Sequence, residues 1–167
     1  MIKLTTPISC EDIKKLKIKD EVLISGIIYT GRDRVLPKLV KLIEDNKVNE
    51  IPFDLEGNMI MHTAVSDAGI ATTTSNKKDI ESSIKTLSEN GIKGHIGKGA
   101  LSEKTKKDLD NGNSVYFVSP PVAALLTDCV KSKKCVMFSE EGMEAIYELE
   151  VENIPGIVAI ANGESIY

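Results

Sequence analysis

The feature that most constrains the fold of this chain is the alternation of short apolar segments with amphipathic ones. Val22–Tyr29 is rich in β-branched residues and nearly continuously apolar, which is typical of a strand covered on both faces. Ser75–Glu89 instead places Ile80, Ile84 and Leu87 at helical spacing. Alternation of this kind predicts an α/β domain with a largely parallel or mixed sheet.

The same patterns continue along the chain. We expect further strands at Met59–Val65, Ile92–Ile96, Ser114–Val118, Cys135–Phe138, Ala145–Val151 and Ile157–Ile160. We expect further helices after Ser9, from Asp33 to about Asp45, from Ser102 to Asn111 and from Val122 to Lys131. The strand-rich C-terminal part should add a second sheet or an antiparallel edge. No linker or repeat interrupts the pattern, so residues 1–167 are expected to form a single domain.

Charge and hydropathy exclude some functional classes. The chain has 21 Lys and Arg against 25 Asp and Glu, a net charge of −4, so it is not expected to bind nucleic acid through excess basic charge. Its apolar runs fall far short of the roughly 20 residues that a bilayer requires, so no membrane partner is expected. The N-terminus lacks the apolar core of a secretory signal, and an odd number of cysteines favours reduced thiols and a cytoplasmic location.

Cysteine and histidine spacing argues against a metal centre within this chain. Cys10, Cys129 and Cys135 include no C-x-x-C pair, so the chain is not expected to hold an iron–sulfur cluster alone. We interpret these thiols as small buried hydrophobic groups. His62 and His95 lack metal-ligand spacing and are interpreted as core or surface imidazoles.

Three positions at predicted strand or helix ends could carry chemistry. Arg32 leaves a buried strand just before a helix, where its planar guanidinium could grip a carboxylate or phosphate, or pair with a neighbouring acid as a structural clamp. The hydroxyl-rich segment Thr72–Lys77 precedes a helix, which favours either an anion site or a simple N-cap. Lys98 stands between Gly97 and Gly99, which would let the backbone approach a ligand closely.

Taken in order, these segments resemble the β subunit, or C-terminal domain, of the class I iron–sulfur fumarate hydratases and related tartrate dehydratases. The resemblance runs from about Leu16 to Tyr167 and is carried by four motifs: Leu23–Asp33, Ile96–Gly99, Gly142–Ile146 and Glu150–Pro155. It implies a three-layer swivelling β/β/α domain with a mixed sheet. It also implies a hydro-lyase active only with an α subunit that carries a [4Fe–4S] cluster, for which a dimer of heterodimers is one assembly.

The resemblance also implies roles for individual residues. Arg32 and Lys98 would bind the carboxylates of a C4 dicarboxylate such as fumarate or malate, and Lys98 would belong to the catalytic set. Thr73 would sit at the reacting carbon, where the family's threonine has been discussed as a proton-transfer group. Lys77 would also contact substrate, at a position where the family usually has arginine.

The sequence departs from the family pattern in several loops. Ala71-Thr72 replaces a Gly-Pro, and Ala64-Val65 replaces an earlier one; Leu36-Pro37 replaces a His-Lys, and Pro120-Pro121 replaces a Gly-Gly. Lysine at position 77 exchanges a bidentate fork for a point charge. Three interpretations therefore remain open: a fumarate/malate hydro-lyase subunit, a tartrate dehydratase subunit, and a non-catalytic anion-binding or scaffold domain.

Overall fold

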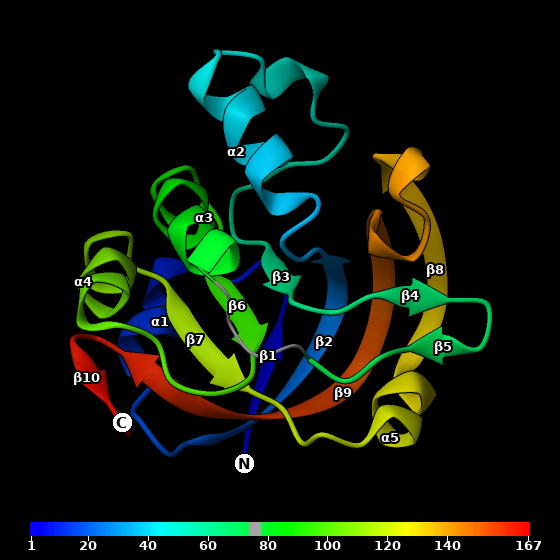
Figure 1. Cartoon of the computed structure of the whole chain (residues 1–167). Coiled ribbons are helices and arrows are strands. Elements are labelled where there is room, and N and C mark those ends of the chain that lie inside the picture. Colours follow the sequence, from blue (N-terminus) through cyan, green and yellow to red (C-terminus); the bar gives the residue numbers. More distant parts are fainter. Residues whose placement is uncertain (74–77) are drawn as a thin grey trace.

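The computed structural model describes residues 1–73 and 78–167, which form a mixed sheet flanked by helices (Figure 1). The strands are β1 (Ile2–Thr5), β2 (Glu21–Thr30), β3 (Met59–Met61), β4 (Val65–Ser66), β5 (Gly69–Ile70), β6 (Gly94–Gly97), β7 (Val115–Val118), β8 (Val130–Met137), β9 (Ile146–Ala161) and β10 (Glu164–Ser165). The helices are α1 (Cys10–Lys15), α2 (Leu36–Glu44), α3 (Lys78–Glu89), α4 (Glu103–Asn111) and α5 (Ala123–Asp128), with 3-10 turns η1 (Val48–Glu50) and η2 (Ser139–Glu144).

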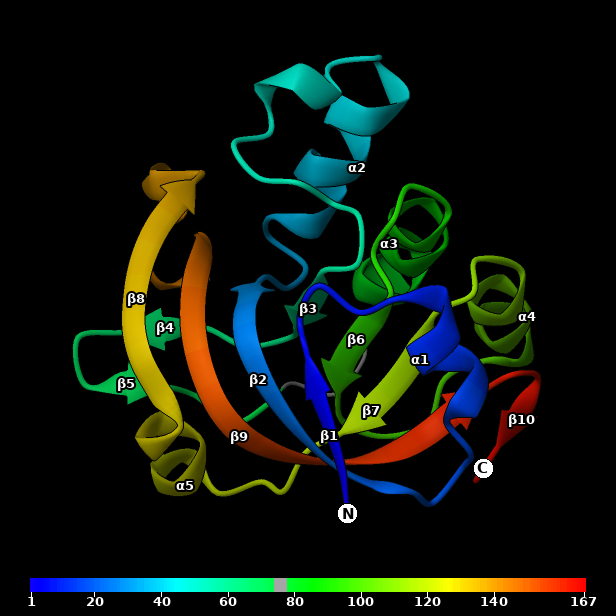
Figure 2. The same ribbon diagram turned by 180° about the vertical axis from the view of Figure 1, so that it is seen from behind.

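The main sheet curls into a partly closed barrel. β2, β3, β6 and β7 are parallel neighbours in that order, and the long antiparallel strand β9 pairs with both β7 and β2. β1 is parallel to the first half of β2, β8 and β10 pair with β9, and β4 and β5 form a separate small hairpin. Figure 2 shows β9 curving beneath the barrel from the β8 side toward β10. The expected mixed α/β sheet is confirmed.

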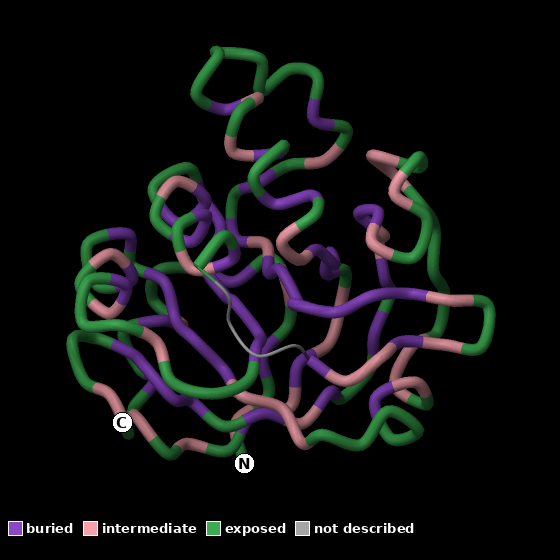
Figure 3. Tube along the Cα trace, viewed as in Figure 1, coloured by how far each residue is buried: buried purple, intermediate pink, exposed green. Residues whose placement is uncertain are grey.

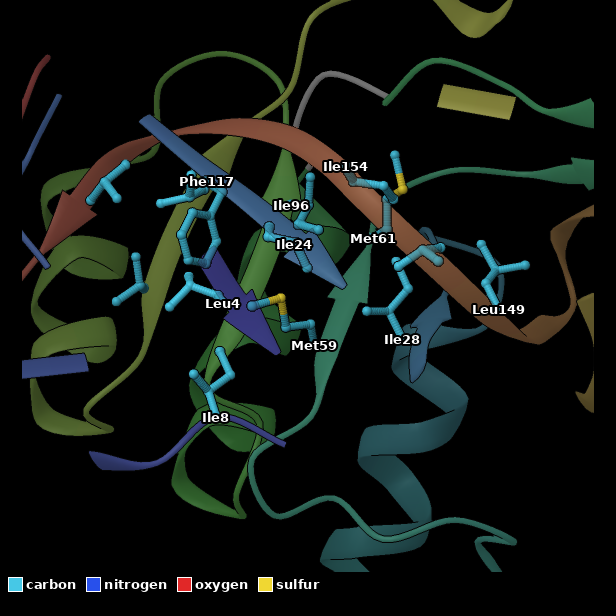
Figure 4. Packing of buried hydrophobic residues seen from close by; sticks show 14 of the residues in the cluster. Leu4, Ile8, Ile24, Ile28, Met59, Met61, Ile96, Phe117, Leu149 and Ile154 are labelled. Carbon is cyan, nitrogen blue, oxygen red and sulfur yellow. The ribbon is translucent and has the colours of Figure 1, made fainter. Parts of the chain in front are cut away.

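Side chains from the inner faces of these strands form the core. Ile24, Ile28, Met59, Ile96 and Phe117 are fully buried and pack against one another (Figure 4). α2 and α3 cover a second cluster, and α4 a third. In Figure 3 the strands other than β8 are largely buried, whereas β8, the outer turns of the helices and the tip of the β4–β5 hairpin are exposed. Among the described residues, none of the helices has both the length and the apolar character that a membrane span requires.

Local sequence signals account for the helix positions. Ser9 accepts a hydrogen bond from the Asp12 amide while the Asp12 side chain accepts from the Ser9 amide, a capping box that starts α1. Ser102 caps α4 by accepting a hydrogen bond from the Thr105 amide, while its own amide donates to Glu81. α2 begins at Leu36 rather than at Asp33, with Pro37 in its first turn, where a missing N–H costs nothing.

Several expectations need correction. β2 is not covered on both faces along its whole length, because Ile27 remains 36% exposed. The two strands expected at Ala145–Val151 and Ile157–Ile160 are one continuous strand, β9. The helix expected at Val122–Lys131 ends at Asp128, and β8 begins at Val130.

The cysteines were also interpreted wrongly as buried groups. Cys10 and Cys135 are exposed, and Cys129 is half-buried. Cys10 begins α1, whereas Cys135 belongs to β8, whose outer surface is open to solvent. The thiols of Cys10 and Cys135 therefore do not contribute to the core, whereas Cys129 packs against the edge of the main cluster.

Candidate functional site

The candidate site lies at the carboxyl ends of the four parallel strands. Thr30, Met61, Ile96 and Phe117 are successive cross-strand neighbours on β2, β3, β6 and β7. Two residues beyond them the chain carries Arg32, Thr63, Lys98 and Ser119. Because neighbouring strands lie about 4.8 Å apart, this register brings two cations and two hydroxyls to one edge of the sheet. Arg32 and Lys98, 66 positions apart in the sequence, are separated by only two strand spacings.

Arg32 is fixed by an acidic partner. Its Nε lies 3.0 and 2.8 Å from Oε1 and Oε2 of Glu144, and its Nη2 lies 2.5 Å from Oε1. Both side chains are partly buried, with exposed fractions of 24% and 21%. Arg32 therefore does pair with an acid of this chain, and that acid is distant in sequence.

The same turn, η2, is held by further ion pairs from the β2–α2 segment. Arg34 Nε lies 3.6 Å from Glu141 Oε1, and Lys38 Nζ lies 3.3 Å from Glu140 Oε1 and 3.7 Å from Glu141 Oε2. The Lys38 ammonium also stands 5.3 Å from the ring centre of Phe138. These contacts anchor η2 beside the Arg32 segment independently of Glu144.

Lys98 is exposed at the end of β6, on a loop supported by Tyr116. The Tyr116 hydroxyl donates to the Gly99 carbonyl over 2.9 Å. A Cβ on Gly97 would approach His62 Nδ1 and the Tyr116 ring to 2.9 Å, so only glycine fits there without displacing a neighbour. Gly99 has a φ of +82°, which glycine adopts readily. The two glycines thus serve different purposes: Gly97 allows close packing against His62 and Tyr116, and Gly99 allows the sharp turn that follows Lys98.

Thr73 lies across the ends of two of these strands. Its side chain is buried, and its Oγ1 lies 3.5 Å from the Ser119 hydroxyl at the end of β7. Two residues before Thr73, the Ala71 carbonyl accepts a hydrogen bond of 2.7 Å from the Thr63 hydroxyl at the end of β3. Thr73 is therefore placed at the same edge as Lys98 and Arg32. Lys77 lies outside the described residues.

Two buried histidines lie beneath this edge. His62 and His95 are fully buried with ring centres 6.2 Å apart, and His95 Nε2 lies 2.9 Å from the Ser88 hydroxyl. Burial and the neighbouring His62 lower the pKa of His95 to about 3, so its imidazole is neutral at physiological pH. The described residues include no group of three or more His, Cys, Asp or Glu side chains that could hold a metal ion.

An open cavity adjoins the site. It has a volume of about 450 Å³ and lies between the β4–β5 hairpin, α5 and η2, bordered by Ala64, Ala71, Thr127 and Met143 among others. Ala71 stands two residues before Thr73, and Met143 is the neighbour of Glu144. A small molecule or a side chain from another protein would fit this volume.

Sequence reasoning did not identify several residues of this site. Glu144 and Tyr116 act through contacts with Arg32 and Gly99 that local patterns do not reveal. Thr63 and Ser119 follow buried strands directly, as Arg32 and Lys98 do, so the same strand-end criterion would have selected them.

Comparison with known proteins shows consistent similarities. A family model described as Fumarase C-terminus matches residues 1–167. A candidate L(+)-tartrate dehydratase subunit beta from Methanocaldococcus jannaschii is 36% identical over 172 residues, covering 94% of this chain and 86% of that protein. The L(+)-tartrate dehydratase subunit beta of Escherichia coli is 27% identical, covering 94% of this chain and 81% of that protein. A candidate class I fumarate hydratase from Geobacillus stearothermophilus is 31% identical over the whole chain, which spans 34% of that protein.

Proposed function

Because the chain belongs to the Fumarase C-terminus family, we propose that it is the β-type subunit of a hydro-lyase that reversibly hydrates a C4 dicarboxylate. Its relatives include proteins named as tartrate dehydratase subunits beta and a candidate class I fumarate hydratase. The single observation that carries the proposal is the gathering of Arg32, Thr73 and Lys98 at the carboxyl edge of β2, β6 and β7. Fumarate or malate is the substrate pair that we propose first.

This arrangement suits the chemistry of dehydration. Removing a proton next to a carboxylate builds negative charge on that carboxylate in the transition state. Preorganised cations stabilise such charge, and here Arg32 offers a planar fork and Lys98 a point charge. We therefore assign substrate binding to Arg32, Thr73 and Lys98, with Lys98 also serving catalysis. Substrate binding by Lys77, which lies outside the described residues, rests on the family resemblance alone.

Thr73 is proposed to work at the reacting carbon. A lone hydroxyl is a poor base at neutral pH, so it needs a proton acceptor beside it. The Ser119 hydroxyl, 3.5 Å from Thr73 Oγ1, gives a route for a proton to leave toward the end of β7. The final acceptor is proposed to come from the partner subunit.

The cluster expected for this family does not fit this chain. Its thiols lie at the start of α1, after α5 and on β8, and none follows β2, β3, β6 or β7. We therefore place a [4Fe–4S] cluster, which would act as a Lewis acid on the substrate hydroxyl, in a separate α subunit. The requirement for that subunit, the swivelling of this domain against it, a dimer of heterodimers and a cytoplasmic location are parts of the same proposal.

Anaerobic co-expression tests the proposal. This chain and a candidate α subunit, encoded beside it and carrying spaced cysteines, should co-purify with cluster absorbance and hydratase activity. The chain alone should show neither. Robust activity of the isolated chain would contradict the division of labour.

Tartrate is the second candidate substrate, favoured by the names of two similar proteins. Initial rates of the complex on fumarate, malate and L(+)-tartrate separate the two, because the true substrate should exceed the others in kcat/KM. A non-catalytic anion-binding or scaffold role is the third reading, suggested by Lys77 and the altered loops. Absence of turnover on all three substrates, with the cluster intact, would favour it.

A further inference from the structure

Glu144 engages one defined edge of Arg32. A guanidinium has a side edge formed by Nε and Nη2 and an end edge formed by Nη1 and Nη2. Both Glu144 oxygens lie within 3.0 Å of Nε, and Oε1 lies 2.5 Å from Nη2, so the carboxylate takes the side edge. A second carboxylate could be gripped by two parallel hydrogen bonds only at the end edge.

Glu144 is presented by a turn that other contacts already hold. Glu140 and Glu141 of η2 pair with Lys38 and Arg34 of the β2–α2 segment. On its C-terminal side, Ala145 and Ile146 are buried where β9 begins. The backbone that presents the Glu144 carboxylate is thus held on both sides.

We propose that Glu144 is the positioning residue of the carboxylate site: by fixing the side edge of Arg32, it directs the end edge toward a substrate carboxylate. This inference rests on the proposed function, since it needs Arg32 to meet an anionic substrate. It adds a residue and a direction of approach. It also explains why a partly buried acid stands beside an anion site, where its charge alone would oppose binding.

Two opposing effects decide the outcome of removing this acid. The negative charge of Glu144 reduces the net attraction of Arg32 for an anion, so its loss would tighten binding if charge dominated. The carboxylate also holds a flexible side chain in one orientation, so its loss would weaken binding if orientation dominated. The proposal commits to the second effect, and the sign of the change in KM tests it.

The experiment uses the complex of this chain with its α subunit and the variant Glu144→Gln. Glutamine keeps the size of the side chain but removes its charge and one acceptor oxygen. KM for the dicarboxylate should rise about tenfold, with kcat lowered less than threefold. Glu141→Gln is the matched control, because Glu141 belongs to the same turn and pairs with Arg34 and Lys38 but not with Arg32. It should leave KM within twofold of the wild type.

Glu144→Asp is the second variant, in case the first fails to assemble. It keeps the charge but shortens the reach, so it should also raise KM. An unchanged or lower KM in whichever variant assembles would overturn the proposal, and a lower one would show that Glu144 competes with substrate.

Titration of succinate, a dicarboxylate that cannot be hydrated, separates this inference from the proposed function. If the wild-type complex binds succinate and Glu144→Gln weakens that binding about tenfold, the positioning role stands even where no substrate turns over. Suppose instead that the wild-type complex turns over and that Glu144→Gln changes neither the affinity for succinate nor KM. The proposed function would then stand, and the positioning role of Glu144 would be wrong. A wild-type complex that neither turns over nor binds succinate would remove both.

Discussion

At the scale of single residues, the site depends on polar groups that are held in one state by burial or by a distant partner. His95 is kept neutral by its surroundings, and Arg32 is oriented by Glu144. Both arrangements make the protein sensitive to changes of one proton or one charge.

His95 should make stability depend on pH. Its pKa is about 3 in the folded state and about 6.5 when unfolded, so between these values the unfolded chain binds more protons. The free energy of unfolding should therefore fall as the pH decreases from 6.5, by up to about 1.4 kcal/mol per pH unit for one proton. Urea unfolding between pH 6.5 and 5.5, above most carboxyl titration, measures this slope.

His95→Gln is the variant for this measurement, since glutamine can still reach the Ser88 hydroxyl. It should flatten the mean slope between pH 6.5 and 5.5 by about 0.7 proton, because the unfolded imidazole is half protonated at pH 6.5 and about nine-tenths protonated at pH 5.5. An identical slope in wild type and variant would show that His95 does not stay neutral.

Replacing Arg32 should affect turnover far more than stability. Arg32→Lys keeps the charge but loses the planar fork, so kcat/KM of the complex should fall at least 100-fold. The substitution also weakens the partly buried ion pair with Glu144. The melting temperature should nevertheless drop by only a few degrees, because about 1 kcal/mol corresponds to roughly 2–4 °C in a protein of this size. Arg34→Lys, at an exposed position of the same segment, should leave both quantities nearly unchanged. A large melting loss with normal turnover of Arg32→Lys would make Arg32 a structural clamp.

Site residues at strand ends could be predicted from the sequence, but those that act across the fold could not. Arg32 and Lys98 directly follow apolar runs, and parallel strands bring such positions to one edge. Glu144 stands 112 residues after Arg32 on an exposed acidic turn, and its sequence context resembles that of a solvated loop. Only the pairing of β2 with β9 brings the two side chains together.

At the scale of elements, local signals set the helices and glycine sets how closely the strand ends pack. The caps Ser9 and Ser102 and the stripe of Ile80, Ile84 and Leu87 were all predicted, because each depends on residues within one or two turns. The continuity of β9 through Pro155 was not predicted. Ile154 to Gly156 pair with β2 alone among the described strands, so on the other side Pro155 interrupts no ladder.

The capping box of α1 should contribute measurably to stability. Ser9→Ala removes the acceptor for the Asp12 amide and should lower the free energy of unfolding by about 1 kcal/mol. Ser82→Ala, on the exposed face of α3, is the control and should change it by less than about 0.5 kcal/mol. Chemical denaturation of the isolated chain gives both values, and equal effects would argue against the box.

Gly97 should tolerate no larger residue. Gly97→Ala would place a Cβ 2.9 Å from His62 and Tyr116, so it should cost about 1–3 kcal/mol of stability and displace the Lys98 loop, lowering turnover. Gly156→Ala is the matched control, because its Cβ would meet its nearest neighbour at 3.4 Å, an ordinary contact. If both variants match the wild type in stability and turnover, Gly97 is not tightly packed beneath the Lys98 loop.

At the scale of the whole molecule, the pairing of β2 with β9 removes most sheet edges. β8 remains as an edge strand, and its lysines oppose pairing with another chain. Among the described strands β8 pairs only with β9, and it carries Lys131, Lys133 and Lys134. Lys133 donates to the carbonyls of Ser66 and Asp67 in the β4–β5 turn. Charged side chains on an open edge discourage pairing with another chain.

Removing this protection should cause self-association. The double change Lys131→Val and Lys134→Val should produce concentration-dependent oligomers of the isolated chain in sedimentation velocity. Lys14→Val and Lys41→Val, on exposed helix faces, form the control pair. Oligomers in both pairs would indicate a general solubility effect, and monomers in both would show that the edge needs no charge.

The pairing of β2 with β9 also determines how late in synthesis the main sheet can finish folding. Tyr29 pairs with Glu148 and Glu21 with Ile157, so residues of β2 must wait for 119 to 136 further residues before their partners on β9 exist. Until then the nascent chain exposes an apolar strand that a chaperone could recognise. A product truncated before position 146 lacks β9 and therefore cannot form the β2–β9 pairing. Ribosomes stalled late in the message would therefore release fragments destined for proteolysis rather than smaller working domains.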